Sequence, residues 1–208
     1  MSDEPSDQLP TNGPNRLLLT VKAEFVPFFF PLLQKGFVQK TEVGCSLREL
    51  LAERFGVPAE YIENRIQTVF LDGKPVDDMD AAVVRDGAVL ALSSAMPGLL
   101  GAIMRKGGYY SRMRSPIGQG TGGDAQRRAD GQVVVKLFNL TVRELGPLFL
   151  ERGIRIDPED LKNLFRNRPE ALEEGCVEAA ADGRRVDPAQ LPALDFPGTQ
   201  VYLKLRTA

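Results

Sequence analysis

Short runs of apolar residues recur along the chain, separated by glycine and proline, and this pattern predicts several strands. The segments 16–25, 36–43, 65–71 and 87–92 have the composition and length of strands. Between the first two lies 26–35, VPFFFPLLQK, whose two prolines exclude a central strand or a regular helix. We therefore expect an irregular or 3₁₀ connection there.

The clearest predicted helix is 46–55, SLRELLAERF. Ser46 is a favourable N-cap, and Glu49 follows it at the spacing of a capping box. The leucines of this segment recur at i, i+3 and i+4 and form one apolar face. Gly56 and Pro58 end the helix.

The second half of the chain repeats the first. The helix pattern returns at 160–168, DLKNLFRNR, where three apolar positions lie 114 residues after their counterparts. The tight-turn sequence DGKPVD at 72–77 returns as DGRRVD at 182–187. Strand-like segments at 132–140 and 200–205 flank these elements. The common order indicates two copies of one unit, and two unrelated α+β halves are the alternative.

This division predicts two hydrophobic cores. The first consists of Leu17, Leu19, Val21, Leu47, Leu50, Leu51, Val69 and Val89. The second consists of Val133, Val135, Leu137, Leu161, Leu164, Phe165, Val177, Val201 and Leu203.

Composition limits the chemistry that the chain can perform. The formal net charge is -2, so bulk charge does not favour a polyanion, and nucleic acid is disfavoured as a partner. The chain has no histidine, which excludes a Ser-His-Asp or Cys-His site built from it alone. Its two cysteines, Cys45 and Cys176, form no CxxC, so neither zinc nor a disulfide framework is expected. Cys45 precedes a predicted helix, where a thiol pKa can fall, but a small buried residue is the preferred interpretation.

The N-terminal segment and the longest apolar stretch both bear on the cellular location of the protein. The polar segment 1–15 lacks the pattern of a signal peptide, and we expect a disordered leader. The longest apolar stretch, 25–33, is shorter than the roughly 20 residues of a membrane helix. We therefore expect a cytoplasmic protein without a membrane partner.

The order strand, strand, helix, strand, turn, strand, with FLDGKPV at 70–76 and VRDGAVLAL at 84–92, resembles the β-grasp (ubiquitin-like) superfamily. The likeness is greatest to the sulfur-carrier branch, which includes the small subunit of molybdopterin synthase and the thiamine-biosynthesis sulfur carrier. The resemblance implies an α+β fold of two tandem β-grasp domains, each a mixed sheet packed on one main helix. The expected boundaries are 1–15 for the leader, 16–98 for the first domain, 99–130 for a glycine-rich linker and 131–208 for the second domain.

Carriers of this family end in a Gly-Gly tail, whose carboxylate is adenylated and converted to a thiocarboxylate or an isopeptide. This chain ends instead in LRTA, and it continues where a carrier stops. Carrier chemistry would require cleavage after Gly98, Gly108 or Gly123. The alternative is that the glycine pairs only make a linker flexible.

Two segments are candidate partner-binding surfaces. The consecutive Phe28, Phe29 and Phe30 either fill the groove between sheet and helix or form a hydrophobic docking patch. The segment RKGGYYSRMR contributes Arg105, Lys106, Tyr109, Tyr110, Arg112 and Arg114. It is a spacer, or packs on a domain, or binds an anionic partner through its cations and rings.

Without a catalytic constellation, the sequence favours a non-enzymatic interaction or scaffold module with protein partners and no cofactor, in which two linked ubiquitin-like domains raise effective concentration. The alternative is a sulfur-carrier or protein-modifier precursor. A third, enzymatic interpretation uses Asp72, Asp77, Asp78 and Asp80 as ligands of a divalent cation. Their partial recurrence in the second half assigns them to the turn instead.

Overall fold

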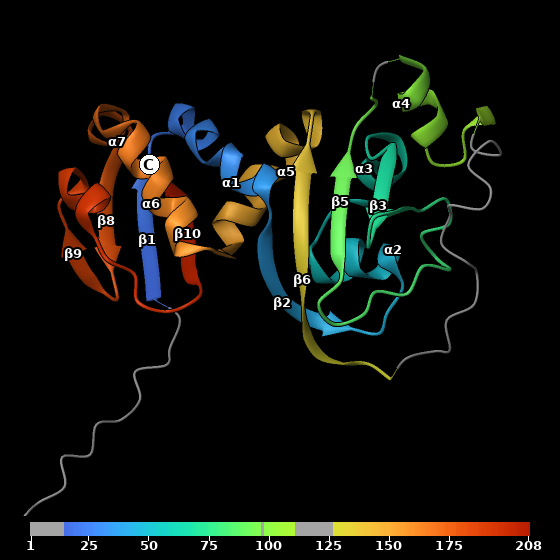
Figure 1. The fold of residues 1–208 in the computed structure, drawn as a ribbon, viewed down its shortest axis with the longest axis horizontal. Coiled ribbons are helices and arrows are strands. Elements are labelled where there is room, and N and C mark those ends of the chain that lie inside the picture. Colours follow the sequence, from blue (N-terminus) through green and yellow to red (C-terminus); the bar gives the residue numbers. More distant parts are fainter. Residues whose placement is uncertain (1–14, 97, 111–126) are drawn as a thin grey trace, which may run out of the picture.

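The computed structural model describes residues 15–96, 98–110 and 127–208. Its strands form one ten-stranded mixed sheet with helices packed against it, which confirms the α+β class (Figure 1). The strands are β1 (Asn15–Val21), β2 (Phe37–Val43), β3 (Thr68–Leu71), β4 (Lys74–Pro75), β5 (Val89–Ser93), β6 (Ala129–Phe138), β7 (Ile154–Ile156), β8 (Cys176–Ala181), β9 (Arg184–Val186) and β10 (Val201–Thr207). The helices are η1 (Ala23–Phe29), α1 (Phe30–Lys35), α2 (Leu47–Glu49), η2 (Leu50–Arg54), α3 (Ala59–Asn64), α4 (Gly98–Met104), α5 (Leu140–Arg152), α6 (Pro158–Asn167), α7 (Pro169–Gly175) and η4 (Pro188–Ala193).

The sheet has two halves that meet at a narrow seam. The strand order is β4-β3-β5-β6-β2-β7-β10-β1-β8-β9, with the seam between β2 and β7. These two strands pair only through Val38 and Arg155. Strands β9, β8, β1 and β10 therefore lie toward one end of the molecule, and β6, β5 and β3 toward the other (Figure 1).

Each half of the sheet contains one strand from the opposite half of the sequence. Strand β6 lies between β5, to which it is parallel, and β2, to which it is antiparallel. Strand β1 lies between β10, again parallel, and β8, again antiparallel. Strand β1 therefore pairs with β10 and β8, and not with β2 or β5 of the unit to which the sequence analysis assigned segment 16–25. Alternating apolar residues determine which side chains face the core, but they do not specify which strand lies alongside.

The two predicted Asp-Gly turns are present. Their hydrogen bonds show how β1, called here the exchanged strand of the second half of the sheet, is held there. Asp72 and Asp182 have φ angles of 51° and 48°, and the glycine after each also has a positive φ, as in a type I′ turn. Asp72 N donates to Val89 O at 2.9 Å, and Val89 N donates to Asp72 Oδ1 at 2.8 Å. Asp182 makes the same two bonds with Arg16, both at 2.8 Å. The start of β1 thus occupies, in the second half, the place that β5 occupies in the first.

Local signals in the sequence predict several of the helices. The helix expected at 46–55 forms as α2 and the π-helical η2, and Ser46 Oγ accepts a hydrogen bond from Glu49 N at 3.2 Å. The connection after β1 begins as the 3₁₀ helix η1, as expected, but then continues as the α-helix α1. The exclusion of a regular helix there is wrong because Pro31 lies in the first turn of α1, where its missing N–H leaves no bond unmade. None of the described helices is long and apolar enough to span a bilayer.

One continuous core joins the two halves. At the seam, the ring of Phe149 on α5 lies 5.0 Å from that of Phe37 and 5.3 Å from that of Phe55. Gly146 lets α1 approach α5 closely, since a Cβ there would lie 2.9 Å from Leu33 Cδ1. The predicted core residues are buried except for Val89, Leu164 and Val177. Val89 is 36% exposed because Ala88 and Leu90 take the inward positions beside it. Val177 is 48% exposed because it lies at a register shift between β1 and β8, where Cys176 takes the inward position opposite Val21.

Candidate binding surfaces

The open face of the sheet, opposite the buried strand positions, carries the candidate functional site. One row of in-register residues crosses six adjacent strands from β5 to β1, and it consists of Val89, Val134, Val38, Arg155, Tyr202 and Arg16. Residues in register on neighbouring strands point to the same face of a sheet. The row is apolar up to the seam and cationic or aromatic beyond it, so the open face has two chemically different halves.

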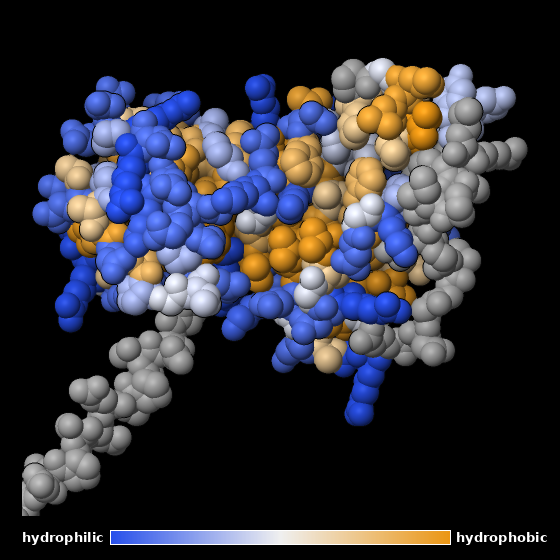
Figure 2. All heavy atoms as spheres, in the orientation of Figure 1, coloured by the Kyte–Doolittle hydropathy of each residue, from blue (hydrophilic) through white to orange (hydrophobic). Residues whose placement is uncertain are grey.

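The apolar half lies over β3, β5, β6 and β2. Its apolar members, called here the apolar face, are Val38, Phe70, Val89, Ala91, Val134 and Phe138. The half-buried Lys136, in register with Ala91, lies among them between Val134 and Phe138. Val89 is 36% exposed and Phe138 is 37% exposed, and the other members are half-buried. Hydrophobic side chains accordingly gather on the surface over β6 and its neighbours (Figure 2).

Helix α4 adjoins one end of the apolar face and forms a groove with it. The groove has a volume of about 440 Å³. It is lined by Phe70, Ala91, Ser93, Met96, Leu100, Phe138 and Asn139. Leu99 and Leu100 of α4 are 67% and 61% exposed, so the helix extends the apolar surface beyond the strands.

The segment 98–110, expected to belong to the linker, is fixed to the first half of the chain. Lys106 Nζ donates to Ile62 O at 2.6 Å, and Gly107 N donates to Asp77 Oδ1 at 3.0 Å. Partial burial lowers the pKa of Lys106. These hydrogen bonds hold this part of the expected linker against the first half of the chain, and Lys106 anchors the segment there.

The two tyrosines that follow are exposed to different degrees. Tyr109 is 86% exposed and Tyr110 is 42% exposed, and their rings meet edge to face at 5.2 Å. Arg105 is also exposed. The remaining candidates of this segment, Arg112, Arg114 and Gly123, lie outside the described residues. Gly98 and Gly108 are described, and Gly98 begins α4.

The three consecutive phenylalanines have unequal surroundings. Phe29 is fully buried, whereas Phe28 and Phe30 are half-buried. The ring of Phe28 stacks on Phe25 at 4.6 Å, and the ring of Phe30 lies against Gly146 of α5. Phe29 therefore belongs to the core, whereas Phe28 and Phe30 pack against it and remain partly exposed.

Both cysteines are free and buried, which confirms the interpretation of Cys45 as a small buried residue. Burial raises the pKa of the Cys176 thiol to about 11. It also raises the pKa of Cys45, so the lowering considered for a thiol at a helix N-terminus does not occur. Neither thiol has the environment of a nucleophile.

The aspartates considered as cation ligands hold the turn and loop together. Asp78 Oδ1 accepts hydrogen bonds from the backbone N–H of Asp80 and of Ala81, at 2.9 and 3.1 Å. The carboxylate of Asp80 pairs with Arg48 at 2.8 Å. Asp72 and Asp77 accept backbone N–H donors, as described above. Within the described ranges, no three Cys, Asp or Glu side chains are arranged to hold a metal ion.

The open face was not among the predicted sites, although the sequence contains a signal for it. Segments 133–135, VVV, and 89–92, VLAL, are apolar at consecutive positions. Such runs are typical of strands that are apolar on both faces. When the helices cover only one face, the other face remains apolar and exposed.

The chain matches no family model, no curated protein and no solved structure. The β-grasp resemblance therefore rests on the sequence motifs given above.

Proposed function

We propose that this chain is a non-catalytic protein-binding module that docks its partner on the apolar face and the α4 groove. The observation that carries the proposal is the run of exposed or half-exposed apolar side chains across four strands, next to Leu99 and Leu100. Apolar surface left in contact with water costs about 25 cal/mol per Å². Contiguous exposed apolar surface is accordingly typical of interaction sites.

The expected occupant is an amphipathic helix of a partner protein. A groove between a helix and a sheet receives such a helix through apolar residues that recur at i, i+3 and i+4. Its volume of about 440 Å³ has room for a few large apolar side chains. Leu100 of α4 and Phe138 of β6 both line the groove and would contact them.

The described titratable groups support a non-catalytic role. The thiols of Cys45 and Cys176 are buried and their pKa values are raised. The aspartates near the first turn accept hydrogen bonds from backbone donors or pair with arginine. A nucleophilic thiol needs a lowered pKa and access to substrate, and the two buried thiols lack both.

We further propose that each half is a β-grasp unit completed by a strand of the other repeat. The strand, helix, strand, turn, strand path occurs in both halves, and the two Asp-Gly turns make equivalent hydrogen bonds. This arrangement weighs against the sulfur-carrier alternative. Cleavage after Gly98 or Gly108 would place β6 on the other fragment, although β6 lies between β5 and β2. A released carrier would lose a central strand of its sheet.

The docking proposal is tested with two variants in the full-length protein, Val134→Asp on the apolar face and Leu100→Asp on α4. Val177→Asp is the matched control, because Val177 is an exposed strand valine outside this surface. Proteins bound to each variant in extracts of the host are quantified by mass spectrometry. We expect both test variants to lose the same bound protein, which the wild type and the control retain.

Stability is measured in parallel by thermal melting, since Val134 is half-buried in a central strand. Leu100 is 61% exposed, and its substitution should change the free energy of unfolding by no more than about 0.5 kcal/mol. If Leu100→Asp and Val177→Asp retain the same proteins in the same amounts as the wild type, the docking proposal is wrong.

A further inference from the structure

The second half of the open face carries a concentrated group of cations. Three in-register rows cross the strands β7, β10, β1, β8 and β9. They consist of Arg155, Tyr202 and Arg16, then Lys204, Leu18, Ala180 and Arg185, then Arg206, Thr20 and Glu178. The five cations of these rows, Arg16, Arg155, Arg185, Lys204 and Arg206, are called here the cationic face. Glu178 is the single acidic residue in the rows.

Little in the protein neutralises this charge. Arg185 Nη2 lies 3.9 Å from Glu178 Oε1, and the two side chains are 82% and 60% exposed, so the pair is weak. Lys204 and Arg206 have no carboxylate partner in the part of the chain that the structure describes. The whole chain has a net charge of -2, so the positive potential is a local property of this face.

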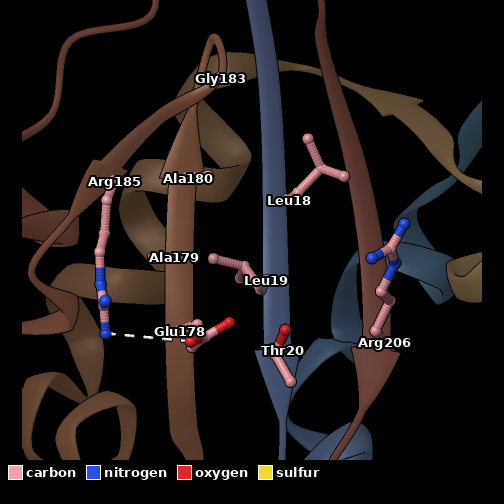
Figure 3. Close-up of a pocket in the computed structure, with 9 residues that line it drawn as sticks. All are labelled: Leu18, Leu19, Thr20, Glu178, Ala179, Ala180, Gly183, Arg185 and Arg206. Atoms are coloured by element: carbon pink, nitrogen blue, oxygen red, sulfur yellow. Dashed lines mark ion pairs between the residues drawn. The ribbon is translucent and has the colours of Figure 1, made fainter.

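A hollow of about 310 Å³ lies between the cations. Leu18, Thr20 and Ala180, uncharged residues of β1 and β8, line it between the charged side chains. Arg185 on β9 and Arg206 on β10 lie on opposite sides of it, with β8 and β1 between them (Figure 3). With strands ~4.8 Å apart and an offset of two residues along them, the backbones at these two residues are separated by about 16 Å.

We propose that the cationic face binds a carboxylate-rich segment of a partner protein in extended conformation. Arginine pairs with a carboxylate through two parallel charge-assisted hydrogen bonds, which gives both affinity and orientation. An extended chain advances about 3.3 Å per residue, so a span of about 16 Å corresponds to acidic residues about five positions apart. This inference concerns a surface separate from the apolar face and does not depend on the proposed function.

The surroundings of Tyr202 favour an acidic segment over a nucleic acid. The guanidinium carbons of Arg16 and Arg155 lie 5.4 and 5.5 Å from the centre of its ring. Its hydroxyl donates to Arg152 O at 3.1 Å. Single-stranded nucleic acids bind to sheets by stacking bases on exposed rings. The ring of Tyr202 is already engaged by two guanidinium groups, so it is not free to stack on a base.

The test uses the full-length protein and fluorescein-labelled octaglutamate, with octaglutamine and a single-stranded oligothymidine as comparison probes. Binding is followed by fluorescence anisotropy at low and physiological salt. The test variant is Arg185→Gln with Arg206→Gln. The control is Arg184→Gln, because Arg184 also belongs to β9 but pairs with Ala181 and so points to the opposite face.

We expect octaglutamate to bind in preference to both comparison probes, more weakly at higher salt. The double variant should lower its affinity by about tenfold or more, since two charge-assisted pairs are lost, while Arg184→Gln should leave it nearly unchanged. Glu178→Gln should raise the affinity, because it removes a carboxylate from the hollow. The proposal is overturned if octaglutamate does not bind, if the control variant weakens binding as much as the double variant, or if oligothymidine binds more tightly than octaglutamate.

Discussion

Cleavage of the chain within residues 111–126 should leave two fragments that remain bound to each other. The N-terminal fragment contains β1, which lies in the sheet of the second half, and the C-terminal fragment contains β6, which lies in the sheet of the first. Each exchanged strand buries three apolar side chains. They are Leu17, Leu19 and Val21 on β1 and Val133, Val135 and Leu137 on β6, all at most 1% exposed.

The size of this contact follows from the burial. Fully burying an apolar side chain contributes about 1.5–3 kcal/mol, so each exchanged strand contributes about 5–9 kcal/mol besides its backbone hydrogen bonds. Association costs about 4–15 kcal/mol in lost translational and rotational freedom. Two exchanged strands, together with the contact between α1 and α5, should therefore hold the fragments together at micromolar concentration.

A protease site introduced between residues 115 and 121 makes the cut, and size-exclusion chromatography with light scattering gives the mass of the product. We expect one species near the 22.8 kDa of the intact chain, which separates into two fragments only in denaturant. Two tandem domains that each keep their own first strand would instead separate after the cut. Separate fragments in native buffer, each retaining its secondary structure, would refute the strand exchange.

Three further predictions concern single residues. Asp182→Ala removes the acceptor of the Arg16 N–H, so we expect the free energy of unfolding, measured in urea, to fall by about 1 kcal/mol. Asp182→Asn keeps an acceptor and should lose less. An unchanged unfolding midpoint for the alanine variant contradicts this prediction. Gly175→Ala places a Cβ 2.1 Å from the ring of Phe25, so we expect the free energy of unfolding to fall by about 1–3 kcal/mol. A melting temperature equal to that of the wild type would be inconsistent with this contact. The pKa of Cys176 is raised to about 11, so this thiol should react slowly with iodoacetamide at pH 8 in the native protein and fully in urea. Mass spectrometry maps the modified cysteine. Equal reaction rates in the native and the unfolded protein would disprove the burial.

The elements predicted correctly are those that depend on neighbouring residues. Ser46 caps its helix because the residue that it caps lies three positions away. Asp72 and Asp182 form tight turns because an Asp-Gly pair tolerates positive φ angles wherever it occurs. The α+β class and most of the buried positions follow from the same local periodicities.

The prediction failed where the outcome depends on distant partners. β1 and β6 both present alternating apolar side chains to the core, so either could occupy the central position in either half. The sequence did not predict the open face for the same reason. Arg16 and Arg155 are far apart in the sequence, and they lie on either side of Tyr202 only because β1 and β7 both pair with β10. Because apolar strand residues are often buried, the prediction also placed Val89 and Val177 in the core, but both side chains are exposed.

The strand exchange is also what separates the two chemistries of the open face. β6 contributes Val134 and Phe138 to the apolar half, and β1 contributes Arg16 to the cationic half. If each strand had remained with its own repeat, Arg16 would lie among the valines of β5 and β2, and Phe138 would lie among the cations of β10. Neither surface would then be continuous. The interlocking of the halves and the division of the face into an apolar and a cationic surface therefore have one structural cause. A change that reversed the exchange would disrupt both of the proposed binding surfaces at once.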